Sequence, residues 1–231
     1  MTSVPSVSEI IDQLKSLSNH VNVAGMARFG INPDNTLGVS MPVLRNTARK
    51  IGRHHELALQ LWDSGIHEAR ILATLVDNPA KVTDEQMEKW TAEFDSWDIC
   101  DQCCSNLYAR IPTAHEKALE WSHRQEEFVK RAGFVMMAVL AVHDKKAEDQ
   151  KFLQCFESIK FGATDKRNFV KKAVNWALRQ IGKRNISLNR QVIALAIEIQ
   201  SMDSPTAHWI AADALRELTG ELVQSRLKNK E

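Results

Sequence analysis

The chain has 231 residues, 44% of them apolar and 26% charged, and 30 Lys and Arg against 29 Asp and Glu give a formal net charge of +1. This composition is typical of a folded globular protein and excludes a disordered chain. The longest stretch free of strongly polar residues, 132–142, is much shorter than the roughly 18 residues that a membrane span needs. Residues 1–16 lack the basic and apolar segments of a secretory signal, and the four cysteines fit a reducing compartment, so we expect a cytoplasmic protein.

Helical periodicity runs along nearly the whole chain, and no segment shows the alternation of a strand. Capping boxes are expected at Ser6–Glu9, Thr83–Gln86 and Thr113–Glu116, and prolines mark two further helix starts, at Pro42 and Pro205. The longest irregular segment covers residues 29–39. We expect helices over residues 6–18, 20–28, 41–53, 55–64, 66–78, 83–94, 97–110, 113–123, 125–143, 147–160, 164–184, 187–202 and 205–220.

Some of these helices look like copies of one another. The segment 173–181 (AVNWALRQI) resembles 210–218 (IAADALREL), which begins 37 residues later. Two-helix units of this length are typical of HEAT-like and armadillo-like solenoids, although an irregular helical bundle remains an alternative. No linker divides the chain, so we expect an all-α solenoid forming a single curved domain over residues 1–231, with an N-terminal helical cap over about 1–28.

Charge is segregated along the chain despite the near-zero total. Residues 160–190 hold nine Lys and Arg and one acid, residues 28–53 hold five and one, and residues 81–101 hold two lysines against seven acids. Such runs are usually solvated helix faces. The basic runs also suit a surface that binds the phosphates of a nucleic acid, and we favour that interpretation.

Helical geometry places a tryptophan inside one basic row. At about 100° per residue, Lys172, Trp176, Arg179 and Lys183 fall within roughly 60° of one another on one helix. A second row comprises Arg45, Arg49 and Arg53. A tryptophan is more often part of a core, but one ringed by cations suits contact with phosphates and an exposed base.

A candidate catalytic carboxylate lies on the expected helix 97–110. Trp97, Asp101, Cys104 and Tyr108 share one helical face. A carboxylate held between aromatic rings can stabilise developing positive charge or position water, although a structural link between helices is an equal alternative. Arg131 lies in an apolar stretch and needs either a carboxylate or a bound phosphate. The cysteines and histidines lack metal-ligand spacing, and no Gly-rich phosphate loop is present, so we expect neither metal nor cofactor.

Four segments together resemble the AlkD-type DNA alkylation repair family. They are 37–45 (LGVSMPVLR), 96–101 (SWDICD), 130–132 (KRA) and 168–179 (NFVKKAVNWALR), and the similarity extends over about residues 25–220. The family consists of alkylpurine DNA glycosylases built from HEAT-like repeats. The resemblance therefore implies a base-excision-repair enzyme whose partner is duplex DNA carrying cationic N3- or N7-alkylated purines. We expect the protein to be a monomer.

The resemblance also implies roles for individual residues. Asp101 would be the catalytic carboxylate, Trp97 and Trp176 would frame the cleft for the lesion, and Arg131 and Arg179 would contact the DNA backbone. Helical spacing adds further candidates: Tyr108 in the cleft, and as DNA-binding cations Lys172, Lys183, Arg45 and Arg49. The chain departs from the family pattern at Phe29, Ser40 and Ser96, which makes lesion preference and efficiency specific to this protein. The alternatives are a non-catalytic DNA-binding paralogue and a HEAT-type protein-interaction scaffold.

Overall fold

The computed structural model describes residues 5–229, and that part of the chain is built of helices without strands. It forms two compact units, one up to Ile111 and one from Pro112 onward. The expectation of a single domain stays a prediction.

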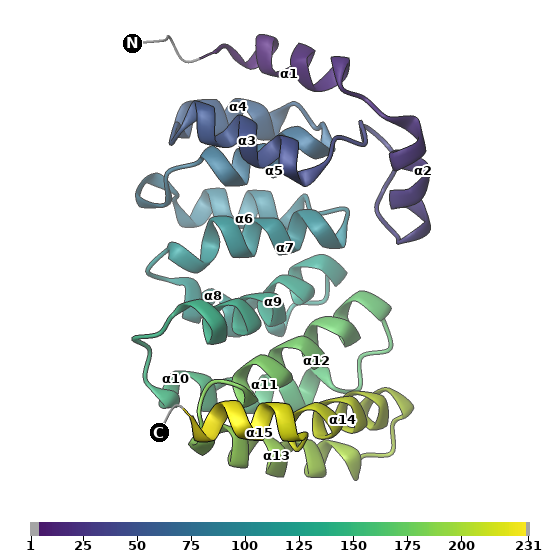
Figure 1. Ribbon diagram of the computed structural model, residues 1–231, viewed down its shortest axis with the longest axis vertical. Helices are drawn as coiled ribbons and strands as arrows, with labels where there is room; N and C mark the ends of the chain where they lie inside the picture. Colours follow the sequence, from purple (N-terminus) through teal and green to yellow (C-terminus); the bar gives the residue numbers. More distant parts are fainter. Residues whose placement is uncertain (1–4, 230–231) are drawn as a thin grey trace. The chain divides into compact units, whose positions relative to one another are not determined.

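The first unit holds α1 (Val7–Ser16), α2 (His20–Arg28), α3 (Met41–Ile51), α4 (His55–Asp63), α5 (His67–Val76), η1 (Pro79–Lys81), α6 (Asp84–Ala92), α7 (Trp97–Asn106) and η2 (Tyr108–Arg110) (Figure 1). The second holds α8 (Ala114–Ser122), α9 (Glu127–His143), α10 (Asp149–Leu153), α11 (Cys155–Gly162), α12 (Asn168–Gly182), α13 (Ile186–Gln200), α14 (Pro205–Leu218) and α15 (Glu221–Lys228).

The expected helices agree with the observed ones to within four residues at their ends, apart from the short turn η1, which was not expected, and three larger differences. The expected helix 97–110 ends at Asn106, because Leu107 leaves helical geometry (φ −122°, ψ −66°) and a short 3₁₀ turn follows. The expected helix 147–160 is two short helices, α10 and α11. Helix α15 was not expected, although its buried Val223 and Leu227 stand four residues apart, as on one face of a helix.

Capping chemistry accounts for several helix starts, though not all the expected ones. Ser6 and Glu9 form a complete capping box. Thr83 accepts a hydrogen bond from the Gln86 backbone N–H, so half of that box forms. The side chain of Thr113 makes no such cap. The capping-box prediction is therefore confirmed in full at one of its three places.

In the first unit, helices α3, α5 and α7 run in the same direction. Glu68, near the start of α5, binds the backbone just before α3, and Arg53, just after α3, donates to Leu75 near the end of α5. Helices α5 and α7 are joined in the same way at both ends, by His67–Asp98 and by Thr74–Asn106. Helices α3, α5 and α7 therefore form one layer of parallel helices. Helices α4 and α6 pack against each other through the stacked rings of Trp62 and Trp90, whose centroids are 4.1 Å apart.

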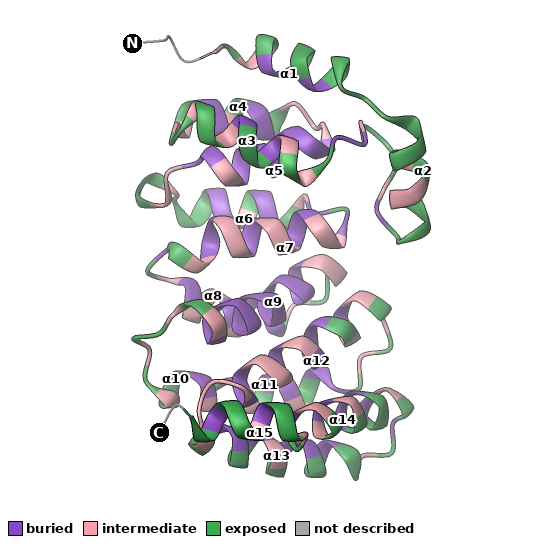
Figure 2. Cartoon of the chain, in the orientation of Figure 1, coloured by how far each residue is buried: buried purple, intermediate pink, exposed green. Residues whose placement is uncertain are grey.

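The second unit repeats this arrangement with α9, α12 and α14. Arg131 of α9 donates to the Phe169 carbonyl at the start of α12, and Arg184, just after α12, donates to Ala141 near the end of α9. Lys171 of α12 lies against the ring of Trp209 near the start of α14, and Lys183, just after α12, binds Glu217 near the end of α14. The predicted stacking of helix pairs is thus present within each unit. Helix α9 is the most deeply buried, and all its residues from Val129 to Ala141 lie in the core (Figure 2). Within residues 5–229, none of the helices combines the length and the hydropathy needed to cross a lipid bilayer.

Candidate nucleic-acid interface

Helix α7 presents Trp97 and Asp101 together at its surface. Both side chains are partly exposed and stand four residues apart, so they are neighbours on one side of the helix. The opposite side is buried and carries Ile99, Cys100, Cys103 and Cys104. Cys104 therefore belongs to the core rather than to the face of Asp101. Of the aromatic residues expected beside the carboxylate on this helix, only Trp97 lies on the same face.

Tyr108 lies in the core rather than in a cleft. The helix ends two residues before it, so the 100° spacing that grouped it with Asp101 no longer applies. Its side chain is completely buried, and its hydroxyl donates to the Met87 carbonyl at 3.3 Å. Burial also raises the pKa of the Tyr108 phenol well above its ordinary value. We therefore remove Tyr108 from the candidate site.

The indole of Trp97 is held by the loop that follows α2. Its Nε1–H donates to the Phe29 carbonyl oxygen at 3.0 Å. One residue earlier, buried Ser96 accepts a hydrogen bond from the Asn32 backbone N–H at 2.9 Å. Ser96, one of the departures from the family pattern, thus has a structural role: it ties the loop to the start of α7.

A buried carboxylate on α5 also fixes the backbone of the same loop. Glu68 is 1% exposed and accepts hydrogen bonds from the backbone N–H groups of Leu37, Gly38 and Val39 at 2.9, 2.6 and 3.2 Å. Gly38 has a φ of +77°, and a Cβ there would lie 2.3 Å from the Asn19 carbonyl oxygen. The loop therefore needs glycine at this position.

Between this loop, α2, α5 and α7 lies a pocket of about 640 Å³. Phe29, Ser40 and Trp97, which are far apart in the sequence, all line it. The imidazole of His67 lies 2.9 Å from the Asp98 carboxylate at its wall. Burial lowers the pKa of His67, but the hydrogen bond to Asp98 and the charges of Asp98, Glu68 and Asp95 outweigh burial and raise it above its ordinary value of 6.5.

The first basic row is shorter than expected. Arg45 and Arg49 are exposed on α3, as predicted. Arg53 is not in the row, because α3 ends at Ile51 and Gly52 turns the chain with a φ of 77°. Its guanidinium instead donates to the carbonyls of Leu75 and Asp77. Arg53 therefore caps carbonyl groups at the C-terminal end of α5.

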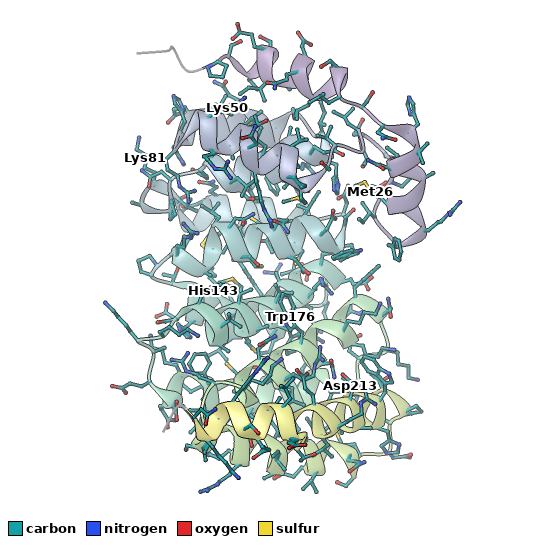
Figure 3. The ribbon with its side chains drawn as sticks, viewed as in Figure 1. Met26, Lys50, Lys81, His143, Trp176 and Asp213 are labelled. Carbon is teal, nitrogen blue, oxygen red and sulfur yellow. The ribbon has the colours of Figure 1, made fainter. Side chains whose placement is uncertain are left out.

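The second basic row reaches the surface in part, because α12 ends at Gly182 and Lys183 follows it as the C-cap, and part of the charge of the row is compensated. Lys172 is exposed and Trp176 is partly exposed on α12. Arg179 and Lys183 both bind Glu217 of α14, at 2.8 and 2.7 Å. Arg179 also lies 3.6 Å from Asp213 of α14, and Figure 3 labels Trp176 and Asp213 on these neighbouring helices. Burial alone would raise the pKa of Glu217, yet the two cations hold it below its ordinary value.

Arg131 is buried, as the sequence indicated. It is 5% exposed, and its guanidinium donates to the Phe169 carbonyl at 2.6 Å. Its neighbour Lys130 is equally buried and forms an ion pair with Asp165 at 3.3 Å. A contact between Arg131 and the DNA backbone stays a prediction, and only a small part of its surface is open to a phosphate.

Trp209 and Phe161 are exposed aromatic residues that the sequence did not single out. Trp209 of α14 is 43% exposed, and the Lys171 ammonium lies 4.7 Å from its ring centroid. The internal repeat contained the signal, since aligning Ala173 with Ile210 puts Trp209 at the outward position of Lys172. Among residues 5–229, no cluster of three or more His, Cys, Asp or Glu side chains is arranged to hold a metal ion.

Comparisons with known proteins agree with this architecture. A solved structure described as "a new family of proteins related to the HEAT-like repeat DNA glycosylases with affinity for branched DNA structures" superposes with a TM-score of 0.80, at 17% identity, over 96% of each chain. The likeness shows that the fold is of the HEAT-like repeat type. Among curated proteins, the uncharacterized protein Lin0241 of Listeria innocua is 30% identical over 122 residues, and Lmo0209 of Listeria monocytogenes is 29% identical over 122.

The matched segment covers 52% of this chain and 52% of each of those Listeria relatives, so about half of their length is represented. The sequence profile of a family described as "DNA alkylation repair enzyme" matches residues 10–218. That span includes both units apart from the chain ends, together with α7 and α12. The chain therefore belongs to the DNA alkylation repair enzyme family.

Proposed function

We propose that this protein binds duplex DNA and releases cationic N3- or N7-alkylated purines by hydrolysis of the N-glycosidic bond. The observation that carries the proposal is the surface row of α7, where the Asp101 carboxylate stands beside the indole of Trp97 in a member of a DNA alkylation repair family. A buried Asp101 would have contradicted it.

The chemistry needs few groups. Alkylation at N3 or N7 gives the purine a positive charge, so it can leave without a general acid. As the glycosidic bond breaks, positive charge develops on the sugar, and a nearby carboxylate stabilises that charge and orients the attacking water. The face of Trp97 adds a favourable interaction with the cationic base. Neither step needs a metal or a cofactor.

The DNA backbone would be bound mainly through the second unit. Residues 112–231 hold 20 Lys and Arg against 15 Asp and Glu, whereas residues 1–111 hold 10 against 14. On α12, exposed Lys172 and partly exposed Trp176 form the surface that suits a phosphate next to a sugar or base. In this proposal Trp176 and the cations of its row bind the substrate, and Arg45 and Arg49 add contacts from α3.

The test is release of free base from a methylated duplex by the wild type and by Asp101→Asn. The substitution keeps the shape of the side chain and removes its charge, so we expect DNA affinity to be retained and release to fall by about a hundredfold or more. Asp63→Asn is the matched control, since Asp63 is an exposed carboxylate on α4. Equal release by wild type and Asp101→Asn would remove Asp101 from the mechanism.

A second candidate function is binding of branched DNA without base release. The ion pairs of Arg179 and Lys183 with Glu217 reduce the positive charge that this row offers to the phosphates of any DNA, so they do not distinguish a duplex from a branched structure. The structural neighbour described as having affinity for branched DNA has the same fold over 96% of this chain. A four-way junction bound much more tightly than a linear duplex, with no base released from either, would establish this alternative.

A further inference from the structure

A cavity of the second unit is lined by positive charge alone. It has a volume of about 270 Å³, and its walls are the C-terminal ends of α9 and α12 together with α15. Four of its lining residues are cations, and none is an acid. The cations of this basic cavity are Lys145, Lys183, Arg184 and Arg226. All the lining residues fall within 141–227, so the basic cavity is complete within this unit.

Two of these cations are held in place by the protein itself. The Arg184 guanidinium donates to the carbonyls of Ala141 and Ala147 at 3.1 and 2.6 Å. Lys183, the residue after α12, forms an ion pair with Glu217 at 2.7 Å. Because both side chains are already ordered, a ligand that binds them loses little further conformational entropy.

The other two cations have no anionic partner in the protein. Lys145, two residues after α9, and Arg226 of α15 are both exposed, and neither forms an ion pair within residues 5–229. They come from different elements but line the same cavity, so their charges repel each other across it. An anion bound between them would replace this repulsion by two attractions.

The ends of the helices account for only part of this positive charge. The last turns of α9, α12 and α15 all contribute to the lining. A helix C-terminus carries the equivalent of roughly half a negative charge and stabilises nearby cations, so some positive charge is expected here without any ligand. Three such ends and the Glu217 carboxylate together offset about 2.5 of the four positive charges. A net positive charge therefore remains in the basic cavity.

We propose that the basic cavity binds a phosphate group. The planar guanidinium groups of Arg184 and Arg226 match the paired oxygens of a phosphate, and Lys145 and Lys183 add two point charges. The cavity is smaller than the roughly 300–1,000 Å³ of pockets for drug-sized ligands, which suits a compact anion. The phosphate belongs either to a small free anion or to the backbone of a DNA strand. Only the second source rests on the proposed binding of DNA, and neither depends on base release.

The chain offers two matched pairs of variants that test the basic cavity without disturbing the fold. Arg226→Gln removes an exposed charge that lines the cavity, and Lys228→Gln removes an exposed charge from the same turn of α15 that does not. Lys145→Gln and Lys146→Gln form the second pair. Both lysines are exposed neighbours after α9, and only Lys145 lines the cavity.

The first experiment measures binding of pyrophosphate by calorimetry at constant ionic strength. We expect Arg226→Gln and Lys145→Gln to bind about tenfold more weakly than the wild type, since each loses a charge-assisted hydrogen bond. Lys228→Gln and Lys146→Gln should bind as the wild type does. No binding by the wild type, or an equal affinity in the lining variants and their controls, would overturn the proposal.

The second experiment identifies the source of the phosphate with an unmethylated duplex, from which no base is released. If DNA supplies the phosphate, pyrophosphate competes with the duplex, and Arg226→Gln reduces the salt slope of duplex binding by about one more than Lys228→Gln does. If a free anion is the ligand, the duplex binds equally with and without pyrophosphate at the same ionic strength, and the two variants share one salt slope. Because pyrophosphate binding needs neither DNA nor base release, the basic cavity can be disproved while the glycosylase stands, and the glycosylase can be disproved while the basic cavity stands.

Discussion

His67 and Asp98 join α5 to α7 at the wall of the pocket. The two side chains are 3% and 16% exposed, so the Nε2–Oδ2 contact of 2.9 Å is only weakly screened by water. The pair explains why a buried histidine is tolerated in the layer formed by α3, α5 and α7: its neighbours Asp98, Glu68 and Asp95 are all acidic and favour the imidazolium.

This pair predicts a definite dependence of stability on pH. Because the folded protein raises the pKa of His67, its contribution is complete below about pH 6.5, the value in the unfolded chain, and disappears as pH rises through the folded pKa. Asp98→Asn should therefore lower the free energy of unfolding most at acidic pH and least at alkaline pH. Urea titrations of both proteins across this range measure the difference. A gap that widened toward alkaline pH would contradict the assigned direction.

At the scale of elements, the loop after α2 is fixed by its backbone. Gly38→Ala would place a methyl group 2.3 Å from the Asn19 carbonyl oxygen at a φ of +77°. We expect a loss of about 2–4 kcal/mol in the free energy of unfolding, since both overpacking and left-handed strain act there. Gly52→Ala is the control, because it shares a positive φ of 77° but has open space around it. An equal loss in both variants would show that close approach at Gly38 is unimportant.

The contact between α12 and α14 sets how much positive charge the basic row presents. Glu217→Gln would release Arg179 and Lys183 from their ion pairs while keeping the shape of the side chain. We expect tighter duplex binding and a steeper dependence on salt, by up to about two counterions. Glu221→Gln, an exposed change on α15, removes the same charge elsewhere and should change binding little. Unchanged binding by Glu217→Gln would exclude Arg179 and Lys183 from the interface.

Lys172 provides the opposite test on the same helix. It is exposed at the outer side of α12, so its charge is available to a phosphate. Lys172→Ala should weaken binding uniformly across sequences and reduce the salt slope by about one. Arg190→Ala removes an exposed cation from α13 and serves as its control. A larger effect at Arg190 than at Lys172 would move the interface to α13.

At the scale of the whole molecule, the sequence predicted those features that are determined within a single helix. The period of apolar residues and the caps located the helices, and spacing on one helix correctly grouped Trp97 with Asp101 and Lys172 with Trp176. Prediction from the sequence failed where a helix ends earlier than expected and where residues far apart in the chain come into contact. Tyr108 left its expected face because α7 ends at Asn106. The partner of Arg179 lies 38 residues further along the chain, at Glu217.

The pocket illustrates the same limit. Its walls come from α2, the loop before α3, α5 and α7, and no periodicity within any one of them reveals the others. The resemblance to a known family marked Phe29 and Ser40 as unusual positions, and the structure shows that both line this pocket. Two of the three departures from the family pattern therefore meet at one pocket, although Phe29 and Ser40 belong to different segments of the chain.

The central claim is that Asp101 stabilises the reacting sugar while an alkylated purine leaves. Base release from a methylated duplex, followed for the wild type, Asp101→Asn and Asp63→Asn at saturating protein, tests it most directly. We predict release of 3-methyladenine or 7-methylguanine by the wild type and by Asp63→Asn, and loss of most of it in Asp101→Asn with DNA still bound. Release that persists in Asp101→Asn, or a wild type that binds methylated DNA and releases no base, would contradict the claim.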